Sequence, residues 1–294
     1  MTGPREAPAR HRTLAIIGAN GQLGQALTEV FSRPDGWRIV PLTHADIEIT
    51  EAESIARALD PAPDFLINTA YWADEDPVMA LRVNALGARR LAEFCATHGT
   101  FLAHMSTDYV FDGETDRSYR ETDRPNPRSV YGISKLAGEH MVAAALPRHL
   151  IVRISSLYGA GGSRAKKGTS FVSDMLDMHR QGKTIRVVTD QFHSPTYAQD
   201  AAAALVELLG REVTGTVHLS NSGVCSKFDF AQRVFDRAGL RADLVPITLA
   251  ELPQNRHWPR YTALAHDALH AAGIPLPRPW EEGLAAHLRR EGIA

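Results

Sequence analysis

The fold of this chain is decided by residues 13–31, which read TLAIIGANGQLGQALTEVF. The first five residues form a short apolar run, and the later part carries apolar residues at helical spacing, namely Leu23, Ala26, Leu27 and Val30. Three evenly spaced glycines lie at the junction: Gly18, Gly21 and Gly24. The stretch therefore predicts a strand, a tight turn and a helix.

The following residues continue this alternation of short apolar runs and helical patterns. Strands are expected at 38–42, 65–68, 100–105 and 150–154, and helices at 51–59 (with Thr50 as N-cap), 79–95 and 136–146. The alternation predicts an α/β fold with a doubly wound parallel sheet that helices cover on both faces. After about residue 159 the pattern is less regular, with helices expected at 171–181, 199–209 and 228–238 and a strand at 184–188.

These patterns suggest two parts. Residues 12–160, with segments that return after residue 184, are expected to form the domain that contains the sheet. Residues 161–294 are expected to form mostly a smaller C-terminal lobe. Residues 1–11 are rich in proline and basic residues and have no apolar run, so a flexible tail is expected there.

Composition restricts the class of protein. The chain has 294 residues and a formal net charge of −2, which argues against a protein built mainly to bind nucleic acid or an anionic membrane. Two distant cysteines, Cys95 and Cys225, exclude a disulfide framework, and the histidines show no metal-ligand spacing. No apolar run reaches the ~18 residues of a membrane helix, and the first residues do not resemble a secretory signal. A cytoplasmic protein without a metal site is expected.

The glycine turn has a chemical interpretation as well as a structural one. Glycines let the backbone approach a phosphate closely, and the N-terminus of the following helix offers free N–H groups to a pyrophosphate. An ordinary glycine-rich turn is the alternative, but the position after the first strand of an α/β pattern favours a dinucleotide site. Asp46 and Glu48 fit the ribose of NAD(H), whereas Arg38 and His44 fit the 2′-phosphate of NADP(H). The sequence leaves this choice open.

A second constellation lies downstream. Tyr131 and Lys135 are four residues apart, so on a helix both side chains share one face, where the ammonium would lower the pKa of the phenol. Thr107 and Asp108 follow a predicted strand whose C-terminal end faces the expected crevice. The alternatives are purely structural. Tyr131 and Lys135 would lie on a solvated helix face, and Ser106 and Thr107 would cap the next turn.

Four longer motifs carry a resemblance. They are STDYVFDG at 106–113, ETDRPNPRSVYGISKLAGE at 121–139, VRISSLYGAGG at 152–162 and DQFHSPTY at 190–197. Together they resemble the dTDP-4-dehydrorhamnose reductase family of extended short-chain dehydrogenases. The resemblance covers nearly the whole chain and implies a Rossmann domain plus a smaller lobe that binds a sugar nucleotide.

The resemblance implies reduction of the C4 keto group of a nucleotide-linked 4-keto-6-deoxy sugar by NADPH or NADH. It implies that Tyr131 donates the proton, that Thr107 assists, and that Lys135 lowers the pKa of the tyrosine and binds the cofactor ribose. It implies substrate contacts at Thr107, Asp108 and Ser156. The other implied cofactor contacts are Gly18, Gly21, Gln22, Leu23, Gly24, Glu48, Ile49, Thr69, Ala70 and Tyr71.

Three departures concern the substrate. The loop NTAYWADEDP at 68–77 is shorter than in the family, and Ser156 stands where the family often has tryptophan. The region HWPRYTALAHDAL at 257–269 matches the family only at Pro259 and Arg260.

Two other functions compete with the reductase. An epimerase or dehydratase of the same class would need further acid–base residues, and the Asp108-Tyr109 pair after Thr107 disfavours it. A non-catalytic regulatory subunit with this fold is the other alternative, which the intact Tyr131 and Lys135 disfavour.

Two surface features also have open interpretations. Arg164, Lys166 and Lys167 either meet the substrate diphosphate or form a solvated loop. The helix at 136–146 has a face of small and apolar residues that either packs in the core or pairs two copies in a homodimer: Ala137, Met141, Ala144 and Ala145.

Overall fold

The structure is a computed structural model that describes residues 11–33, 36–74, 76–161, 170–253 and 257–293. The predicted tail at 1–11 lies almost entirely outside these residues, as do Arg164, Lys166 and Lys167. Within them, no helix is both long and apolar enough to pass through a bilayer, and no three His, Cys, Asp or Glu side chains cluster as metal ligands would.

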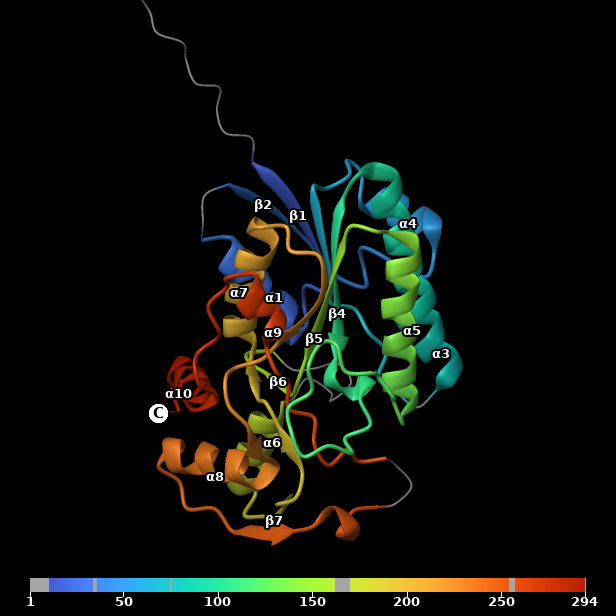
Figure 1. The fold of residues 1–294 in the computed structure, drawn as a ribbon. Coiled ribbons are helices and arrows are strands. Elements are labelled where there is room, and N and C mark those ends of the chain that lie inside the picture. Colours follow the sequence, from blue (N-terminus) through green and yellow to red (C-terminus); the bar gives the residue numbers. More distant parts are fainter. Residues whose placement is uncertain (1–10, 34–35, 75, 162–169, 254–256, 294) are drawn as a thin grey trace, which may run out of the picture.

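A six-stranded sheet forms the centre of the larger part (Figure 1). Its order is β10-β5-β4-β3-β1-β2, with all neighbours parallel. The strands are β1 (Arg12–Ile17), β2 (Trp37–Leu42), β3 (Phe65–Asn68), β4 (Phe101–Thr107), β5 (His149–Ile154) and β10 (Gly215–Leu219). The order changes direction between β1 and β3, and the parallel doubly wound architecture is confirmed.

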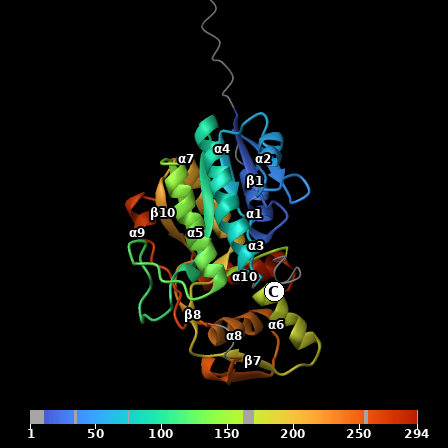
Figure 2. The same cartoon turned by 90° about the vertical axis from the view of Figure 1, so that its right-hand side faces the viewer.

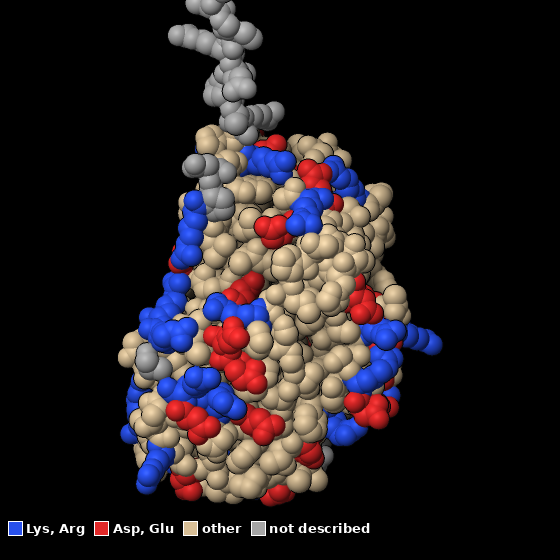
Figure 3. Space-filling view, turned by 60° about the vertical axis from the view of Figure 1, so that its left-hand side comes forward, with Lys and Arg blue, Asp and Glu red and all other residues tan. Residues whose placement is uncertain are grey.

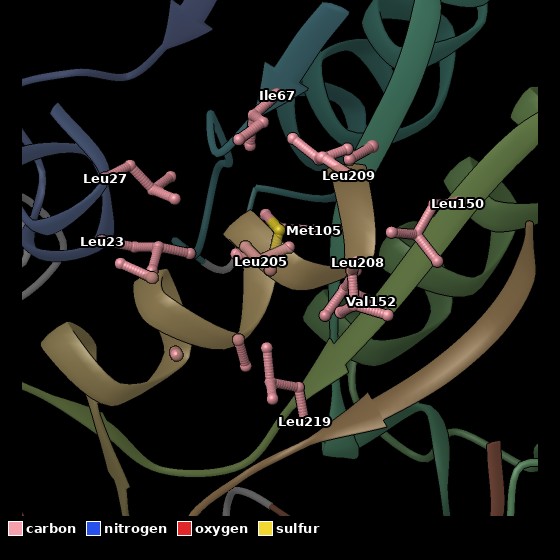
Figure 4. Packing of buried hydrophobic residues seen from close by; sticks show 14 of the residues in the cluster. Leu23, Leu27, Ile67, Met105, Leu150, Val152, Leu205, Leu208, Leu209 and Leu219 are labelled. Carbon is pink, nitrogen blue, oxygen red and sulfur yellow. The ribbon is translucent and has the colours of Figure 1, made fainter. Parts of the chain in front are cut away.

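Helices cover both faces of the sheet (Figures 1 and 2). One face packs on α1 (Gln22–Phe31), α7 (Ala198–Gly210) and α9 (Asp267–Ala271), through the leucine-rich core shown in Figure 4. The opposite face packs on α2 (Ala52–Ala58), α4 (Ala88–His98) and α5 (Val130–Ala145). Strand residues alternate between the two cores, so that Leu14 and Ile16 face α1 while Ala15 and Ile17 face the other layer.

The remaining segments form the smaller lobe at the other end of the molecule (Figure 2). It contains α6 (Phe171–Arg180), α8 (Lys227–Ala238) and α10 (Trp280–Arg290), with short strand pairs. These strands are β6 (Leu157–Tyr158), β7 (Ile185–Val188), β8 (Phe192–His193), β9 (Thr196–Tyr197), β11 (Cys225–Ser226) and β12 (Leu244–Ile247). Aromatic side chains fill its core, among them Tyr158, Phe230 and Phe235. Short 3-10 turns lie at Asp108–Val110 and Leu249–Glu251.

Several local expectations were wrong. The N-cap of α2 is Glu51 and not Thr50. The backbone N–H of Thr50 instead donates to Glu48 Oε1 at 2.9 Å.

The helix expected at 79–95 consists of three parts: α3 (Pro77–Leu81), a π-helical segment (Arg82–Gly87) and α4. The wider turn lets Asn84 donate from Nδ2 to the Trp72 carbonyl at 2.8 Å and to Ser134 Oγ at 2.9 Å. Helix α5 starts at Val130, six residues before the expected position.

The sheet also has one strand that the sequence did not predict. Its sixth strand, β10, follows α7 and pairs with β5 in register from Gly215 opposite Leu150 to Leu219 opposite Ile154. The strand expected at 184–188 is present as β7 in the smaller lobe, where it pairs with β12.

Ion pairs connect the C-terminal segments to the larger part. Arg290 on α10 binds Glu29 on α1 at 2.6 Å, and Arg278 binds Asp200 on α7 at 2.6 Å.

Figure 3 shows acidic and basic side chains intermixed over one face of the molecule. The two cysteines lie in different cores, since Cys95 belongs to the α2/α4/α5 layer and Cys225 to the core of the smaller lobe.

Candidate active site

A cavity of about 660 Å³ lies at the carboxyl ends of the sheet strands and extends to the smaller lobe. Parallel sheets bind ligands at this edge, where the strand order reverses. Of the site residues expected from the sequence, all but Gly24 line this cavity. They are Gly18, Gly21, Gln22, Leu23, Glu48, Ile49, Thr69, Ala70, Tyr71, Thr107, Asp108, Tyr131, Lys135 and Ser156.

The turn after β1 forms one end of the cavity. Gly18 has a φ of +80°, and a Cβ there would meet Thr69 Oγ1 at 2.5 Å. Helix α1 begins after Gly21 without a side-chain cap and without an acidic residue in its first turn. Its first N–H groups and its positive dipole end can therefore receive an anion such as a pyrophosphate.

Gly24 contributes to the packing of helix α1 on the glycine turn. It does not line the cavity, and a Cβ there would meet the Gly18 carbonyl oxygen at 2.2 Å and Ala19 Cα at 2.6 Å. Its missing side chain therefore lets α1 pack closely on the turn after β1. The contact of Gly24 with a cofactor stays a prediction.

The start of α5 places Tyr131. Ser129 caps the helix by accepting a hydrogen bond from the Gly132 N–H at 3.1 Å. Gly132 allows close approach, because a Cβ there would meet the Tyr109 carbonyl oxygen at 2.2 Å. The ring of Tyr131 consequently lies between Tyr71 and Tyr109, with centroid distances of 6.0 and 6.1 Å.

The environment keeps the Tyr131 phenol protonated. Burial raises its pKa, as does the neighbouring Tyr71, while a hydrogen bond with Thr107 opposes the rise. The net shift is upward, because the desolvation of the phenolate dominates. The lowering of this pKa by Lys135 stays a prediction. A neutral phenol is the form that can donate a proton.

Lys135 lies one helical turn further along α5. Its Nζ donates to the Met105 carbonyl oxygen at 2.6 Å, and its side chain is buried. Burial lowers the pKa of Lys135 to about 8, although the carboxylate of Glu139 favours the charged form. The ammonium is thus fixed between β4 and α5 at the cavity wall.

Thr107 and Asp108 form a buried polar pair at the end of β4. Thr107 Oγ1 donates to Asp108 Oδ1 at 3.1 Å and accepts from the Tyr109 N–H at 3.2 Å. Asp108 Oδ2 accepts from Ser155 Oγ at 2.8 Å. Burial raises the pKa of Asp108, while hydrogen bonds from Thr262 and Ser155 and the charge of Lys227 oppose the rise. Thr107 does cap the next turn, and its hydroxyl also lines the cavity.

Another part of the cavity wall comes from the segment after β2, which lies next to the glycine turn, and from the π-helical segment. Glu48 and His44 line it, whereas Asp46 and Arg38 do not. Asp46 is used locally, because its carboxylate accepts from the Thr43 N–H at 2.8 Å. Arg82, which was not predicted, lines this part of the cavity as well. Burial raises the pKa of Glu48, but hydrogen bonds from Thr50 and the charges of His44 and Arg82 outweigh this effect, so the pKa is lowered overall.

Comparison with known proteins gives the family. The sequence model described as RmlD substrate binding domain matches residues 12–292. The chain belongs to this family. The membership confirms the resemblance that the four motifs carry.

Individual relatives and a solved structure are also similar to this chain. A dTDP-4-dehydrorhamnose reductase of Mycobacterium tuberculosis is 38% identical over 290 residues, which cover 95% of this chain and 93% of the relative. The spore coat polysaccharide biosynthesis protein SpsK of Bacillus subtilis is 34% identical, with coverage of 95% and 98%. The crystal structure of dTDP-4-dehydrorhamnose reductase from Bacillus anthracis in complex with NADP superimposes with a TM-score of 0.89 at 33% identity, covering 95% of this chain and 99% of that one.

Further cavity residues of this RmlD-family chain were not predicted. Lys227 and His193, from the smaller lobe, line the cavity next to Ser156. His193 stands inside the motif at 190–197 but had no assigned role, and Lys227 is the first residue of α8. A lysine is disfavoured at the positive end of a helix dipole, and that unusual position was the signal available in the sequence.

Proposed function

We propose that this protein reduces the C4 keto group of a nucleotide-linked 4-keto-6-deoxy sugar, with dTDP as the nucleotide and NADPH or NADH as the reductant. One observation carries the proposal: Tyr131, Thr107 and Lys135 line the same cavity as the glycine turn of α1. The names of the relatives at 38% identity and of the NADP-bound structure supply the substrate and cofactor class.

The cavity fits a dinucleotide. Gly18 and Gly21 line the cavity without side chains, and the uncapped N-terminus of α1 offers N–H donors to a pyrophosphate. Ile49 and Glu48 would contact the adenosine half, and Thr69, Ala70 and Tyr71 would flank the path toward Tyr131. A reduced nicotinamide supplies the hydride when it is bound.

The residues of the chain manage the proton. As the carbonyl carbon is reduced, its oxygen gains negative charge, and the neutral phenol of Tyr131 donates a proton to it. Thr107 offers a hydroxyl to the same oxygen, in exchange for its hydrogen bond to Asp108. The Lys135 ammonium, held by Met105, stabilises negative charge at this wall and binds the ribose hydroxyls. Asp108 and Ser156 contact the sugar.

A panel of nucleotide-linked 4-keto sugars with NADPH and with NADH tests this function. Consumption of the reduced nicotinamide is followed by its absorbance, and the product is identified by mass spectrometry. Turnover with the dTDP-linked 4-keto-6-deoxy sugar supports the proposal. Absence of turnover with every sugar, from a protein that binds the cofactor, refutes it in favour of a non-catalytic role.

We also propose that the protein acts in the cytoplasm, where nucleotide sugars and nicotinamide cofactors are available.

We further propose that the protein forms a homodimer through the surface of α5 and its neighbours. Exposed large apolar side chains on α3, the π-helical segment and α5 favour this contact: Val78, Leu81, Leu86 and Ile133 are 43–71% exposed. Light scattering of the purified protein measures the number of copies, and a monomeric mass would contradict the dimer.

A further inference from the structure

We infer that Lys227 is a specificity-determining residue, which forms with Ser156 and His193 a subsite for an oxygen-rich group of the sugar nucleotide. The inference rests on the proposed function, because it describes how the same cavity selects its substrate. The residues come from three segments of the chain: the connection between β5 and β6, strand β8 and the start of α8.

Direct contacts hold the Lys227 ammonium at the cavity wall. Its Nζ donates to Ser156 Oγ at 2.9 Å and lies 3.3 Å from His193 Nδ1. It also lies 5.5 Å from the centroid of the Phe171 ring, a cation–π distance. All four residues line the cavity. The positive charge is therefore fixed at one place in the wall, on the side that the smaller lobe contributes.

The local structure disfavours two of these placements. Ser156 has a φ of +43°, in the left-handed region that residues with a Cβ rarely adopt. Lys227 occupies the first turn of α8, where the helix dipole repels a cation. Strained positions of this kind persist where the surroundings impose them and are concentrated at functional sites. These two disfavoured residues, Ser156 and Lys227, form a hydrogen bond with each other, which indicates a binding site and not only a structural contact.

The chemistry of the subsite favours ligand groups that have oxygen atoms as hydrogen-bond acceptors. Ser156 Oγ accepts the hydrogen bond from Lys227, and among the described residues no group accepts the hydrogen of the Ser156 hydroxyl in return. That hydrogen can therefore point to a ligand in the cavity, beside the ammonium charge. A cation and a hydroxyl donor at one wall bind phosphate or sugar oxygens and disfavour an apolar substituent.

The subsite is next to the reacting groups. Ser155, the neighbour of Ser156, donates to Asp108, which in turn holds Thr107. A single sugar nucleotide could thus place its keto group at Tyr131 and another of its groups at Lys227 and Ser156. The candidates are the diphosphate and the hydroxyls of the sugar ring, which share the chemistry of oxygen acceptors.

Steady-state kinetics with the dTDP-linked 4-keto sugar tests the inference. Lys227→Met keeps the length of the side chain and removes its charge, so KM is expected to rise about 10- to 100-fold, as for the loss of a charged hydrogen bond. The kcat is expected to change much less, and Lys227→Arg is expected to recover part of the loss. Lys183→Met is the matched control, since Lys183 is exposed and does not line the cavity.

Binding measurements identify the group and separate this inference from the proposed function. Calorimetry with dTDP and with dTDP-glucose needs no turnover. If Lys227 binds the diphosphate, Lys227→Met weakens both ligands equally, and if it binds the sugar, only dTDP-glucose is weakened. The inference is overturned if Lys227→Met binds dTDP-glucose as tightly as the wild type, or if its only loss is in NADPH affinity. A wild type that binds dTDP-glucose but reduces no keto sugar refutes the proposed function alone.

Discussion

At the scale of single residues, the site depends on what burial does to two titratable groups. Desolvation raises the pKa of the Tyr131 phenol and lowers that of the Lys135 ammonium to about 8. Both shifts favour the neutral form of each group. At neutral pH the phenol therefore keeps its proton, which suits an acid, while Lys135 is close to losing its own.

Tyr131→Phe tests the acid. The ring and its contacts with Tyr71 and Tyr109 are kept, so NADPH is expected to bind as in the wild type, while kcat falls about 100- to 10,000-fold for the loss of a general acid. Cofactor binding is measured by nicotinamide fluorescence and turnover by absorbance. Near-normal turnover of the variant would show that another group donates the proton.

The pH dependence of kcat/KM tests Lys135. Activity requires the ammonium, so kcat/KM is expected to decrease as pH rises through about 8, where the buried Lys135 loses its proton. The phenol contributes no decrease there, because its pKa is raised above 10. Lys135→Arg is expected to be less active at pH 7 and to lack this alkaline decrease, since a guanidinium keeps its charge. An unchanged pH profile in that variant would assign the decrease to another group.

These residues also show what the sequence could and could not predict about the site. Local motifs were enough to select Tyr131, Lys135 and Thr107 as candidates, and the structure brings all three to one cavity. The direction of the Tyr131 pKa shift did not follow, because burial by Tyr71 and Tyr109 depends on segments distant in sequence. Lys227 and His193 were missed for the same reason, since only folding brings them to Ser156.

At the scale of elements, the cavity depends on close packing between α1 and β1. Gly24 has no side chain to separate the helix from the turn, so the first N–H groups of α1 reach the cavity. Similar contacts occur at Gly132, where α5 approaches the Tyr109 backbone. Glycine thus determines how near each helix comes to the edge of the sheet where ligands bind.

Gly24→Ala tests this packing. The new methyl group would overlap the Gly18 carbonyl, so α1 has to move, with an expected loss of about 1–3 kcal/mol of unfolding free energy, as for overpacked cores, and weaker NADPH binding. Gly210→Ala, at the end of α7 where nothing lies within 4 Å, is the control and is expected to be neutral or stabilising. Equal stability and NADPH affinity for both variants would contradict the packing role.

The sequence predicted elements well where their pattern was long or strictly local. The first strand, the glycine turn and the following helix were correct because apolar spacing and glycine chemistry agree there. Strand β10 was missed because GTVHL at 215–219 is short and its apolar positions are few. The π-helical segment at Arg82–Gly87 was missed because it serves a tertiary contact, the hydrogen bonds of Asn84 to the Trp72 backbone.

At the scale of the whole molecule, a few polar contacts connect the smaller lobe to the helices of the sheet domain. Asp200 on α7 accepts hydrogen bonds from Arg278 Nε at 2.9 Å and from Asn221 Nδ2 at 2.7 Å. Only 11% of the Asp200 side chain is exposed, so this pair is better shielded than an ordinary surface pair. The contact fixes the segment that leads into α10.

Asp200→Ala tests that connection. It leaves Asn221 and Arg278 without their shared acceptor, so the unfolding free energy in urea is expected to fall by about 1–3 kcal/mol, and KM for the sugar nucleotide is expected to rise. Asp177→Ala breaks an exposed pair with Arg180 and is expected to cost less than about 1 kcal/mol. The connection would be disproved by equal effects of the two substitutions.

The two cysteines offer a way to watch the parts of this molecule separately. Burial raises the pKa of each thiol to about 12, and the side chains are 0% and 5% exposed, so neither Cys95 nor Cys225 is reactive while its surroundings stay closed. Since they lie in different cores, the rate at which iodoacetamide alkylates each one reports the opening of its own half. Peptide mapping by mass spectrometry at increasing urea concentration would then show, without any engineered cysteine, which core unfolds first. Repeating the measurement with a dTDP-sugar or NADPH would show whether the ligand protects that core from unfolding.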